Sequence, residues 1–141
     1  MLAPCEPTKI VVVGLTTRNT QHESAYEIPD EPMISIKPAS AVIGPGDAIV
    51  YPKSSTRVDP EAESAVVIGK RAHEVPTAGV DEYILGYTCF NDVMVRDLQG
   101  RDKQWMRGKG FDAFAPMGSW VVPHAQPGGR ELLCLVNGEV R

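Results

Sequence analysis

Glycine and proline interrupt this chain at short intervals, and they limit its possible folds more than any other feature of the sequence. The 141 residues include 13 Gly and 12 Pro, together about 18% of the chain, where about 12% is usual. Pro removes a helix hydrogen bond and clashes with the preceding turn, and Gly weakens a helix through its conformational freedom. Long helices are therefore excluded over most of the sequence.

The segments between these residues are short, β-branched or aromatic, and bounded by Pro, Gly, Asn or Asp, which is typical of strands. We predict strands at Lys9–Val13, Met33–Ile36, Ala48–Val50, Ala62–Ile68, Tyr83–Phe90, Trp120–Val122 and Leu132–Val136. We predict turns at Ile43–Asp47 and at Val136–Glu139, which contains an Asn-Gly pair. Helix is predicted only at Asn19–Ala25 and from Val93 to about Met106. Residues 1–141 are expected to form one mostly β domain with short helices, an α+β fold.

Composition excludes several classes of function. Fourteen basic and eighteen acidic residues give a net charge of −4 without a basic block, so nucleic acid is not an expected partner. The longest aliphatic runs, Ile10–Val13 and Ala65–Ile68, fall far below the roughly 20 residues that cross a bilayer, and no signal peptide is recognisable. Cys5, Cys89 and Cys134 are odd in number and form no CxxC, which favours neither disulfides nor zinc. We expect a cytoplasmic protein that does not bind membranes.

An acidic pair opens one of the predicted strands. In a strand, residues two apart share a face, so Glu61, Glu63, Ala65 and Val67 form one row. Glu side chains about 6.6 Å apart at Cβ can converge on one cation. Carboxylates at the rim of a core repel each other, and hard oxygen ligands suit Mg²⁺, Mn²⁺ or Ca²⁺. The alternative is an exposed strand entrance with two solvated acids.

A third acid, Asp92, follows the predicted strand Tyr83–Phe90 and precedes a predicted helix. Its ordinary role would be to cap that helix. Gln99 lies seven positions later, almost two helical turns, which would put both side chains on one side of the helix. The polar residues around Gln99 are otherwise explained as a solvated helix face.

Six motifs, in order, resemble those of the fumarylacetoacetate hydrolase family. They are Lys37–Asp47, Arg57–Gly69, Gly86–Gln99, Arg101–Trp105, Lys109–Gly118 and Val136–Arg141, and the resemblance extends from about Lys9 to the last residue. It implies a mixed β-roll or barrel, incomplete at its C-terminal edge, and a Mg²⁺ or Mn²⁺ site formed by Glu61, Glu63 and Asp92. It also implies small 2-oxo acid substrates with a 1,3-dioxo or enol arrangement.

The resemblance further implies that Lys109 and Gln99 contact substrate or metal-bound water, that Arg18 binds substrate, and that Glu23 is a lid acid or base. Members of the family cleave C–C bonds with water, decarboxylate or isomerise through a metal-stabilised enolate. The function expected here is that of a divalent-metal enzyme in catabolism. The alternative is a non-catalytic or truncated homologue that binds metal without turnover.

One departure from the family pattern concerns the lid. Family members have a His three residues before the lid Glu, whereas this chain has Thr20 before Glu23. His22 would lie roughly 200° around a helix from Thr20, so we expect it at the surface. Because a Thr hydroxyl cannot activate water as a base, we expect decarboxylation or keto–enol isomerisation in preference to hydrolysis.

A second departure concerns the Asn-Gly pair of the last predicted turn, which only Glu139, Val140 and Arg141 follow. A returning strand needs about five residues. We therefore expect Leu132, Leu133 and Leu135 to be partly uncovered or paired with another chain, and a homodimer is the expected assembly.

Overall fold

The computed structural model describes residues 1–14, 30–102, 104–125, 128 and 131–140. In this part of the chain the elements, in order, are β1 (Ile10–Gly14), β2 (Met33–Lys37), η1 (Ala39–Ala41), β3 (Val42–Ile43), β4 (Val58–Asp59), β5 (Ala62–Ile68), η2 (Thr77–Tyr83), β6 (Ile84–Asn91), β7 (Met94–Val95), α2 (Arg96–Arg101), α3 (Met106–Lys109), β8 (Ala115–Pro116), β9 (Leu135–Val136) and β10 (Glu139–Val140). The predicted class, mostly strands with a few short helices, is confirmed.

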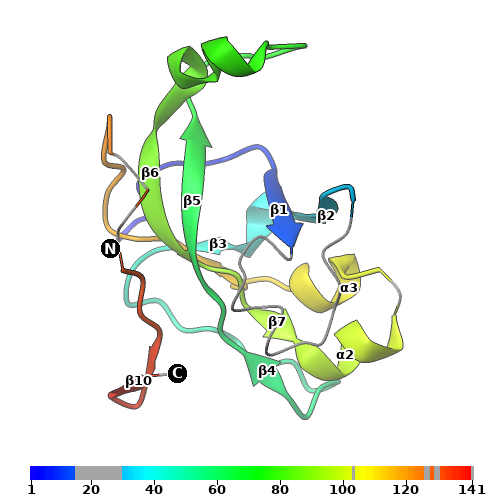
Figure 1. Ribbon diagram of the computed structural model, residues 1–141. Coiled ribbons are helices and arrows are strands. Elements are labelled where there is room, and N and C mark those ends of the chain that lie inside the picture. Colours follow the sequence, from blue (N-terminus) through cyan, green and yellow to red (C-terminus); the bar gives the residue numbers. More distant parts are fainter. Residues whose placement is uncertain (15–29, 103, 126–127, 129–130, 141) are drawn as a thin grey trace.

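The largest strand pair is β5 with β6, which forms the long ribbon in Figure 1. The two strands are antiparallel, with Glu63 opposite Phe90 and Ala65 opposite Thr88. Residues of β5 that share the row of Glu63 are half-buried, whereas Ser64, Val66 and Ile68 are exposed. The alternation expected of this strand is therefore confirmed, and one face of the ribbon lies against the interior.

The remaining strands of the described residues form small two-stranded pairs. β1 pairs with β2, β4 with β7 and β9 with β10, all antiparallel, whereas β3 and β8 are parallel. Isolated bridges join Tyr87 of β6 to Val122 and Phe90 to Met117. The result is a mixed β fold in which α2 and α3 lie side by side, away from the β5–β6 ribbon (Figure 1).

Among the residues that the structure describes, two clusters of buried side chains form the core. One contains Ala41, Phe90, Ala115 and Met117, and the other contains Val93, Val95, Leu98 and Phe114. The chain passes from the first cluster to the second between Phe90 and Val93, and the intervening Asp92 is fully buried. A carboxylate is thus held in the interior, where it needs charged or hydrogen-bonding partners.

Some of the predicted elements differ from those observed. Ala48–Val50 forms no strand, and Ile49 and Val50 are exposed. Trp120–Val122 makes only the bridge at Val122, and the strand expected at Leu132–Val136 is limited to Leu135–Val136. Both predicted turns are present, with Gly46, Asn137 and Gly138 at positive φ.

The helix expected from Val93 to about Met106 is also wrong in part. Its first residues form β7 because Met94 and Val95 pair with β4 and are buried. Only Arg96–Arg101 and Met106–Lys109 are helical. The helix expected at Asn19–Ala25 lies outside the described residues.

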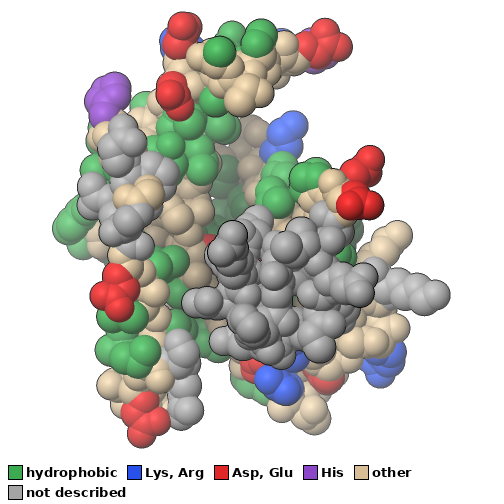
Figure 2. All heavy atoms as spheres, viewed as in Figure 1, with side chains coloured by type: hydrophobic (Ala, Val, Ile, Leu, Met, Phe, Trp, Pro, Cys, Tyr) green, Lys and Arg blue, Asp and Glu red, His purple; other side chains and the backbone are tan. Residues whose placement is uncertain are grey.

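Apolar side chains remain exposed along the segment that leads to β9. Leu132, Leu133 and Leu135 are exposed, as predicted, and Val140 of β10 is exposed as well. Figure 2 shows apolar side chains on the left of the molecule, beside this hairpin. None of the helices in the described part of the chain has the length and apolar character needed to cross a membrane.

Candidate metal and substrate site

The register of β5 and β6 brings Glu61, Glu63 and Asp92 together. Ala62 pairs with Asn91, so the next pair outward is Glu61 with Asp92. The Asp92 amide donates to the Glu61 carbonyl at 2.9 Å, and the Glu61 amide donates to Asn91 Oδ1 at 3.0 Å. One carboxylate oxygen from each of the three acids lies within 4.8 Å of the others. The two acids that open β5 and the one that ends β6 therefore converge on the inner face of the ribbon.

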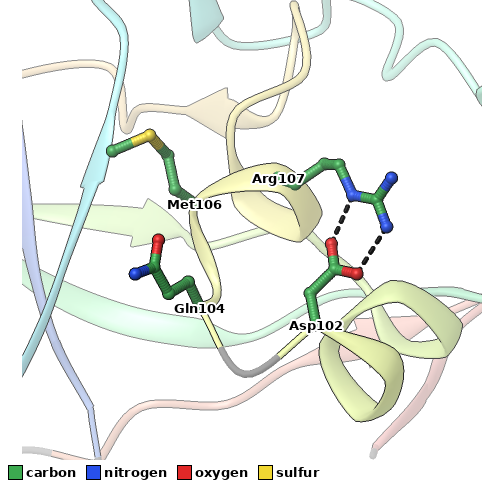
Figure 3. Close-up of a pocket in the computed structure, with 4 residues that line it drawn as sticks. All are labelled: Asp102, Gln104, Met106 and Arg107. Atoms are coloured by element: carbon green, nitrogen blue, oxygen red, sulfur yellow. Dashed lines mark hydrogen bonds and ion pairs between the residues drawn. The ribbon is translucent and has the colours of Figure 1, made fainter.

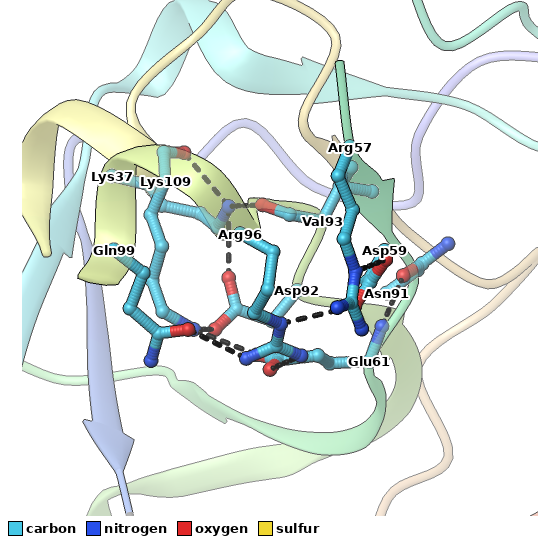
Figure 4. Close-up of polar contacts among 10 residues, drawn as sticks. All are labelled: Lys37, Arg57, Asp59, Glu61, Asn91, Asp92, Val93, Arg96, Gln99 and Lys109. Carbon is cyan, nitrogen blue, oxygen red and sulfur yellow. Dashed lines mark hydrogen bonds and ion pairs between the residues drawn. The ribbon is translucent and has the colours of Figure 1, made fainter. Parts of the chain in front are cut away.

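We define Glu61, Glu63 and Asp92 as the carboxylate cluster. Basic side chains from three elements point at Glu61 and Asp92, as Figure 4 shows. Lys109 Nζ, at the end of α3, donates to Glu61 Oε2 at 2.9 Å and to Asp92 Oδ2. Arg96 Nη2, at the start of α2, donates to Glu61 Oε1 at 2.7 Å. Lys37 Nζ, at the end of β2, lies 2.8 Å from Asp92 Oδ1. Acidic and basic side chains are thus joined by ion pairs and hydrogen bonds in one cluster.

Arg96 extends this network to two further side chains. Its Nε donates to Asp59 Oδ2 at 3.1 Å, and its Nη1 donates to Gln99 Oε1 at 2.7 Å. Asp59 also accepts from Arg57. The hydrogen bond from Arg57, followed by the contribution of Arg96, lowers the pKa of Asp59. Asp59 is therefore a stable anion that holds Arg96 against Glu61.

The ionisable groups of the site respond differently to burial. Burial, reinforced by the negative charge of Asp92, raises the pKa of Glu63 to about 7. Burial lowers the pKa of Lys37 even though Asp92 acts against it. Burial also acts to lower the pKa of Lys109, but the charges of Asp92 and Glu61 outweigh it and the pKa is raised. Lys109 is accordingly protonated at neutral pH, so it is a cation and a hydrogen-bond donor.

A close backbone approach sets the position of α3 and hence of Lys109. Gly108 packs against β7, and a Cβ built there would lie 2.9 Å from Met94 Sδ and 3.2 Å from the Val95 carbonyl oxygen. Met94 and Val95 are fully buried. Because Gly108 has no side chain, α3 can pack closely against β7. This close packing brings the next residue, Lys109, to the carboxylate cluster.

The three carboxylates fit a divalent cation. Adjacent oxygen ligands of octahedral Mg²⁺ lie about 3.0 Å apart and opposite ones about 4.2 Å apart, while the longer Ca²⁺ bonds allow about 5 Å. The oxygens here lie within 4.8 Å of one another, so a cation of this class needs little movement of the side chains. Glu63 also lacks an ion pair of the kind that Glu61 and Asp92 make with Lys109 within the described residues. The donor set suits Mg²⁺, Mn²⁺ or Ca²⁺, and Glu61, Glu63 and Asp92 are the residues that would hold it.

Two of the sequence interpretations of these acids are wrong. Asp92 does not cap a helix, because the chain continues as β7 and α2 begins at Arg96 with Val95 at its N-cap. The alternative of solvated acids at an exposed strand entrance is also wrong. The Glu61 side chain is only 25% exposed and is hydrogen-bonded, and Glu63 is half-buried. Asp92 beside them is fully buried.

Gln99 reaches the site, but not for the reason given by helical spacing. Asp92 lies outside α2, so the two residues do not share a helix face. Gln99 is linked to Glu61 through Arg96. The remaining candidates, Arg18, Glu23 and Thr20 together with His22, lie outside the described residues.

Sequence reasoning missed two residues of the site, Lys37 and Arg96. Lys37 ends an apolar strand in which Ile34 and Ile36 are exposed while Ser35 and Lys37 are buried, the reverse of the usual pattern. No signal in the strand itself reveals this inversion. Arg96 offered a signal, since it lies three positions before Gln99 and an i, i+3 pair faces the same way on a helix.

A pocket of about 360 Å³ lies elsewhere, lined by Asp102, Gln104, Met106 and Arg107 (Figure 3). Arg107 donates from Nε and Nη2 to the Asp102 carboxylate across it. None of the carboxylate cluster lines this pocket, and it is not the candidate site.

Comparison with known proteins identifies relatives over nearly the whole chain. Residues 9–141 match a family model described as the C-terminal region of fumarylacetoacetate (FAA) hydrolase. An uncharacterised protein of Archaeoglobus fulgidus is 46% identical over 139 residues, which cover 99% of this chain and 56% of that protein. The mitochondrial oxaloacetate tautomerase Fahd2a of Rattus norvegicus is 40% identical over 144 residues, covering 99% of this chain and 46% of the relative.

A solved structure is similar to this chain in both fold and sequence. The crystal structure of a 5-carboxymethyl-2-hydroxymuconate delta-isomerase from Mycobacterium smegmatis matches with a TM-score of 0.89 and 44% identity, over 99% of this chain and 56% of that one. The chain thus spans about half the length of the relatives that it matches.

Proposed function

Because the chain belongs to the fumarylacetoacetate hydrolase family, we propose that it carries the divalent-metal centre of an enzyme that isomerises small 2-oxo acids between keto and enol forms. Relatives of this chain include a protein named as an oxaloacetate tautomerase and another named as a 5-carboxymethyl-2-hydroxymuconate delta-isomerase. The proposal concerns the metal ligands, the substrate class and the type of reaction together.

The observation that carries the proposal is the convergence of Glu61, Glu63 and Asp92 within 4.8 Å, with the Lys109 ammonium at their edge. A 2-oxo acid offers a carboxylate and an adjacent carbonyl, both hard oxygen donors that suit the same cation. When bound, a divalent cation supplies a Lewis acid that stabilises negative charge on the substrate oxygen.

The residues of this chain have separable roles in such a site. Lys109 is a cation held at the carboxylate cluster, so it can donate a hydrogen bond to an enolate oxygen as negative charge develops there. Gln99 is a neutral donor and acceptor next to Arg96, suited to orienting a substrate carboxylate. Arg18 would add a second positive charge for that carboxylate.

Isomerisation also requires a proton to leave the carbon next to the carbonyl and another to reach the oxygen. We assign removal and return of the carbon proton to Glu23, which acts as acid and base in turn, while the proton on the substrate oxygen is exchanged with solvent water. This chemistry requires no activated water, so Thr20 in place of a lid His is compatible with it. Hydrolysis of a C–C bond would need a base for water that Thr20 does not provide.

The proposal is tested by following conversion of enol oxaloacetate to the keto form by ultraviolet absorbance, with Mg²⁺ or Mn²⁺ and after chelation. Acceleration above the spontaneous rate that is lost on chelation supports it. A matched pair of variants sharpens the test: Asp92→Asn should abolish the acceleration, and Asp81→Asn, at an exposed acid of η2, should retain it.

The alternative is a homologue that binds metal without turnover. Cation binding without acceleration of oxaloacetate, acylpyruvates or related 2-oxo acids would favour this alternative. Homodimer formation and a cytoplasmic location stay predictions.

A further inference from the structure

The Lys37 side chain is fully buried, and its ammonium is surrounded by oxygen atoms from three separate segments. Nζ donates to the carbonyls of Val93 at 2.8 Å, Lys109 at 2.8 Å and Phe114 at 2.9 Å. These carbonyls lie just before β7, at the end of α3 and just before β8. One ammonium therefore joins the segment between β6 and β7, which carries Asp92, to the helix that carries Lys109.

The same ammonium has a fourth oxygen neighbour, Asp92 Oδ1, at 2.8 Å. An ammonium has three protons, and the three carbonyls accept them. Asp92 Oδ1 is buried and is left without a hydrogen bond of good geometry among the described residues. The contact between Lys37 and Asp92 is thus mainly one of charge, and the second oxygen of Asp92 faces Lys109.

Burial of this lysine is unfavourable in itself. Removing an ammonium from water carries a large desolvation cost, and a buried ion pair is weak evidence for stability. An apolar side chain of similar length would fill the space, but it would leave three carbonyls and a carboxylate without partners. What Lys37 provides is a fixed geometry: the direction of the Asp92 carboxylate and the place of the Lys109 backbone.

We propose that Lys37 is a positioning residue of the metal site, which orients the Asp92 carboxylate as a ligand and holds α3 so that Lys109 faces the same point. The inference rests on the proposed metal-binding function of the carboxylate cluster. It concerns a residue that touches neither cation nor substrate and acts through Asp92 and through the backbone.

Three possible roles for Lys37 predict different changes in the affinity for a divalent cation when Lys37 is replaced. If Lys37 acts only through its charge, its removal should tighten cation binding, because a positive neighbour of Asp92 is lost. If it only stabilises the fold, the folded variant should bind as the unaltered protein does. If it positions Asp92, the variant should bind more weakly, by tenfold or more, as for other partners that orient metal ligands.

The experiment compares Lys37→Met with Met117→Ala in the full chain, using Mn²⁺ and isothermal titration calorimetry. Met117 lies in the core cluster around Ala41 and Phe90, and its truncation should lower stability without touching the carboxylate cluster. Both variants are titrated at a temperature where circular dichroism shows them folded. A loss of affinity of tenfold or more in Lys37→Met, with Met117→Ala unchanged, is the expected result.

Unchanged or tighter Mn²⁺ binding by folded Lys37→Met would overturn the inference and leave the proposed metal site standing. No binding by the unaltered protein would overturn both. These two failures are therefore distinguishable in the same set of titrations.

If Lys37→Met does not fold, the unaltered chain decides the matter by NMR of lysine labelled with ¹⁵N at Nζ. The Lys37 ammonium signal is assigned as the slowly exchanging one that survives in Lys109→Met. Addition of diamagnetic Mg²⁺ should shift this signal while leaving it slow to exchange, because Asp92 changes its environment and the three carbonyls remain. A signal that does not respond at saturating Mg²⁺ would refute the role.

Discussion

Arg96 donates from Nη2 to Oε1 of Glu61 at 2.7 Å, and the same guanidinium also bonds Asp59 through Nε and Gln99 through Nη1. These three acceptors lie around the planar guanidinium, and reaching all of them requires N–H donors on three separate nitrogen atoms. A lysine has its donors on a single nitrogen and cannot reproduce the arrangement.

Arg96→Lys should therefore lower the free energy of unfolding by about 1 kcal/mol, a value kept small because the Arg96 side chain is 31% exposed. Urea denaturation measures it. Arg57→Lys is the matched control, since Arg57 also bonds Asp59 but is 66% exposed, and its effect on the free energy of unfolding should be clearly smaller. Equal effects of the two changes would mean that Arg96 does not organise the site.

Glu63→Gln should weaken Mg²⁺ and Mn²⁺ binding by more than about tenfold, because it removes one charged oxygen ligand while preserving the shape of the side chain. Calorimetry measures the affinity. Glu82→Gln removes the same charge from an exposed residue of η2 and should leave binding unchanged. Similar affinities for both variants would show that Glu63 is not a ligand.

Lys109→Met should affect binding and turnover in opposite directions. Its loss removes a positive charge beside Glu61 and Asp92, so cation affinity should hold or rise. The rate of isomerisation should fall by roughly 10²-fold or more, as when a donor to a developing oxyanion is removed. The comparison is with Lys53→Met, at an exposed position. A parallel loss of affinity and rate in Lys109→Met would instead point to a collapsed site.

Thr20→His should raise hydrolysis of acylpyruvates relative to isomerisation of oxaloacetate, since His and Glu23 would then be spaced as a base and its partner, three residues apart. Rates for both substrates, measured in the unaltered protein, in Thr20→His and in Thr20→Ala, give the ratio. Fast acylpyruvate hydrolysis by the unaltered protein, or a constant ratio across the variants, would contradict this account of reaction type.

Only part of the acidic site follows from local rules in the sequence: strand alternation pairs the two Glu residues, whereas Asp92 is added by the family resemblance. Alternation along β5 puts Glu61 and Glu63 in one row, and Asp92 stands where β6 ends. The antiparallel register that joins them follows from the pairing of two long strands. A pattern of period two is therefore enough to pair the two Glu residues, but not to place Asp92, which depends on the register of β5 with β6.

Lys37 could not be found in this way. The oxygens that surround it belong to Asp92, Val93, Lys109 and Phe114, which come together only in the folded chain. Tertiary contacts likewise override the local pattern at Met94–Val95, where a sequence predicted as helix forms a strand against β4, and at Ala48–Val50, where an apolar run has no partner strand among the described residues.

The close packing of Gly108 against Met94 has an evolutionary consequence. A side chain at position 108 would meet the sulfur of Met94 at 2.9 Å, so the two positions share one small volume. Relatives with Ala or Ser at the position of Gly108 should carry a residue smaller than Met at the position of Met94, and relatives that keep the Met should keep the Gly. Selection at these positions would therefore act on the pair, and a single exchange at either would be tolerated only after the other had changed.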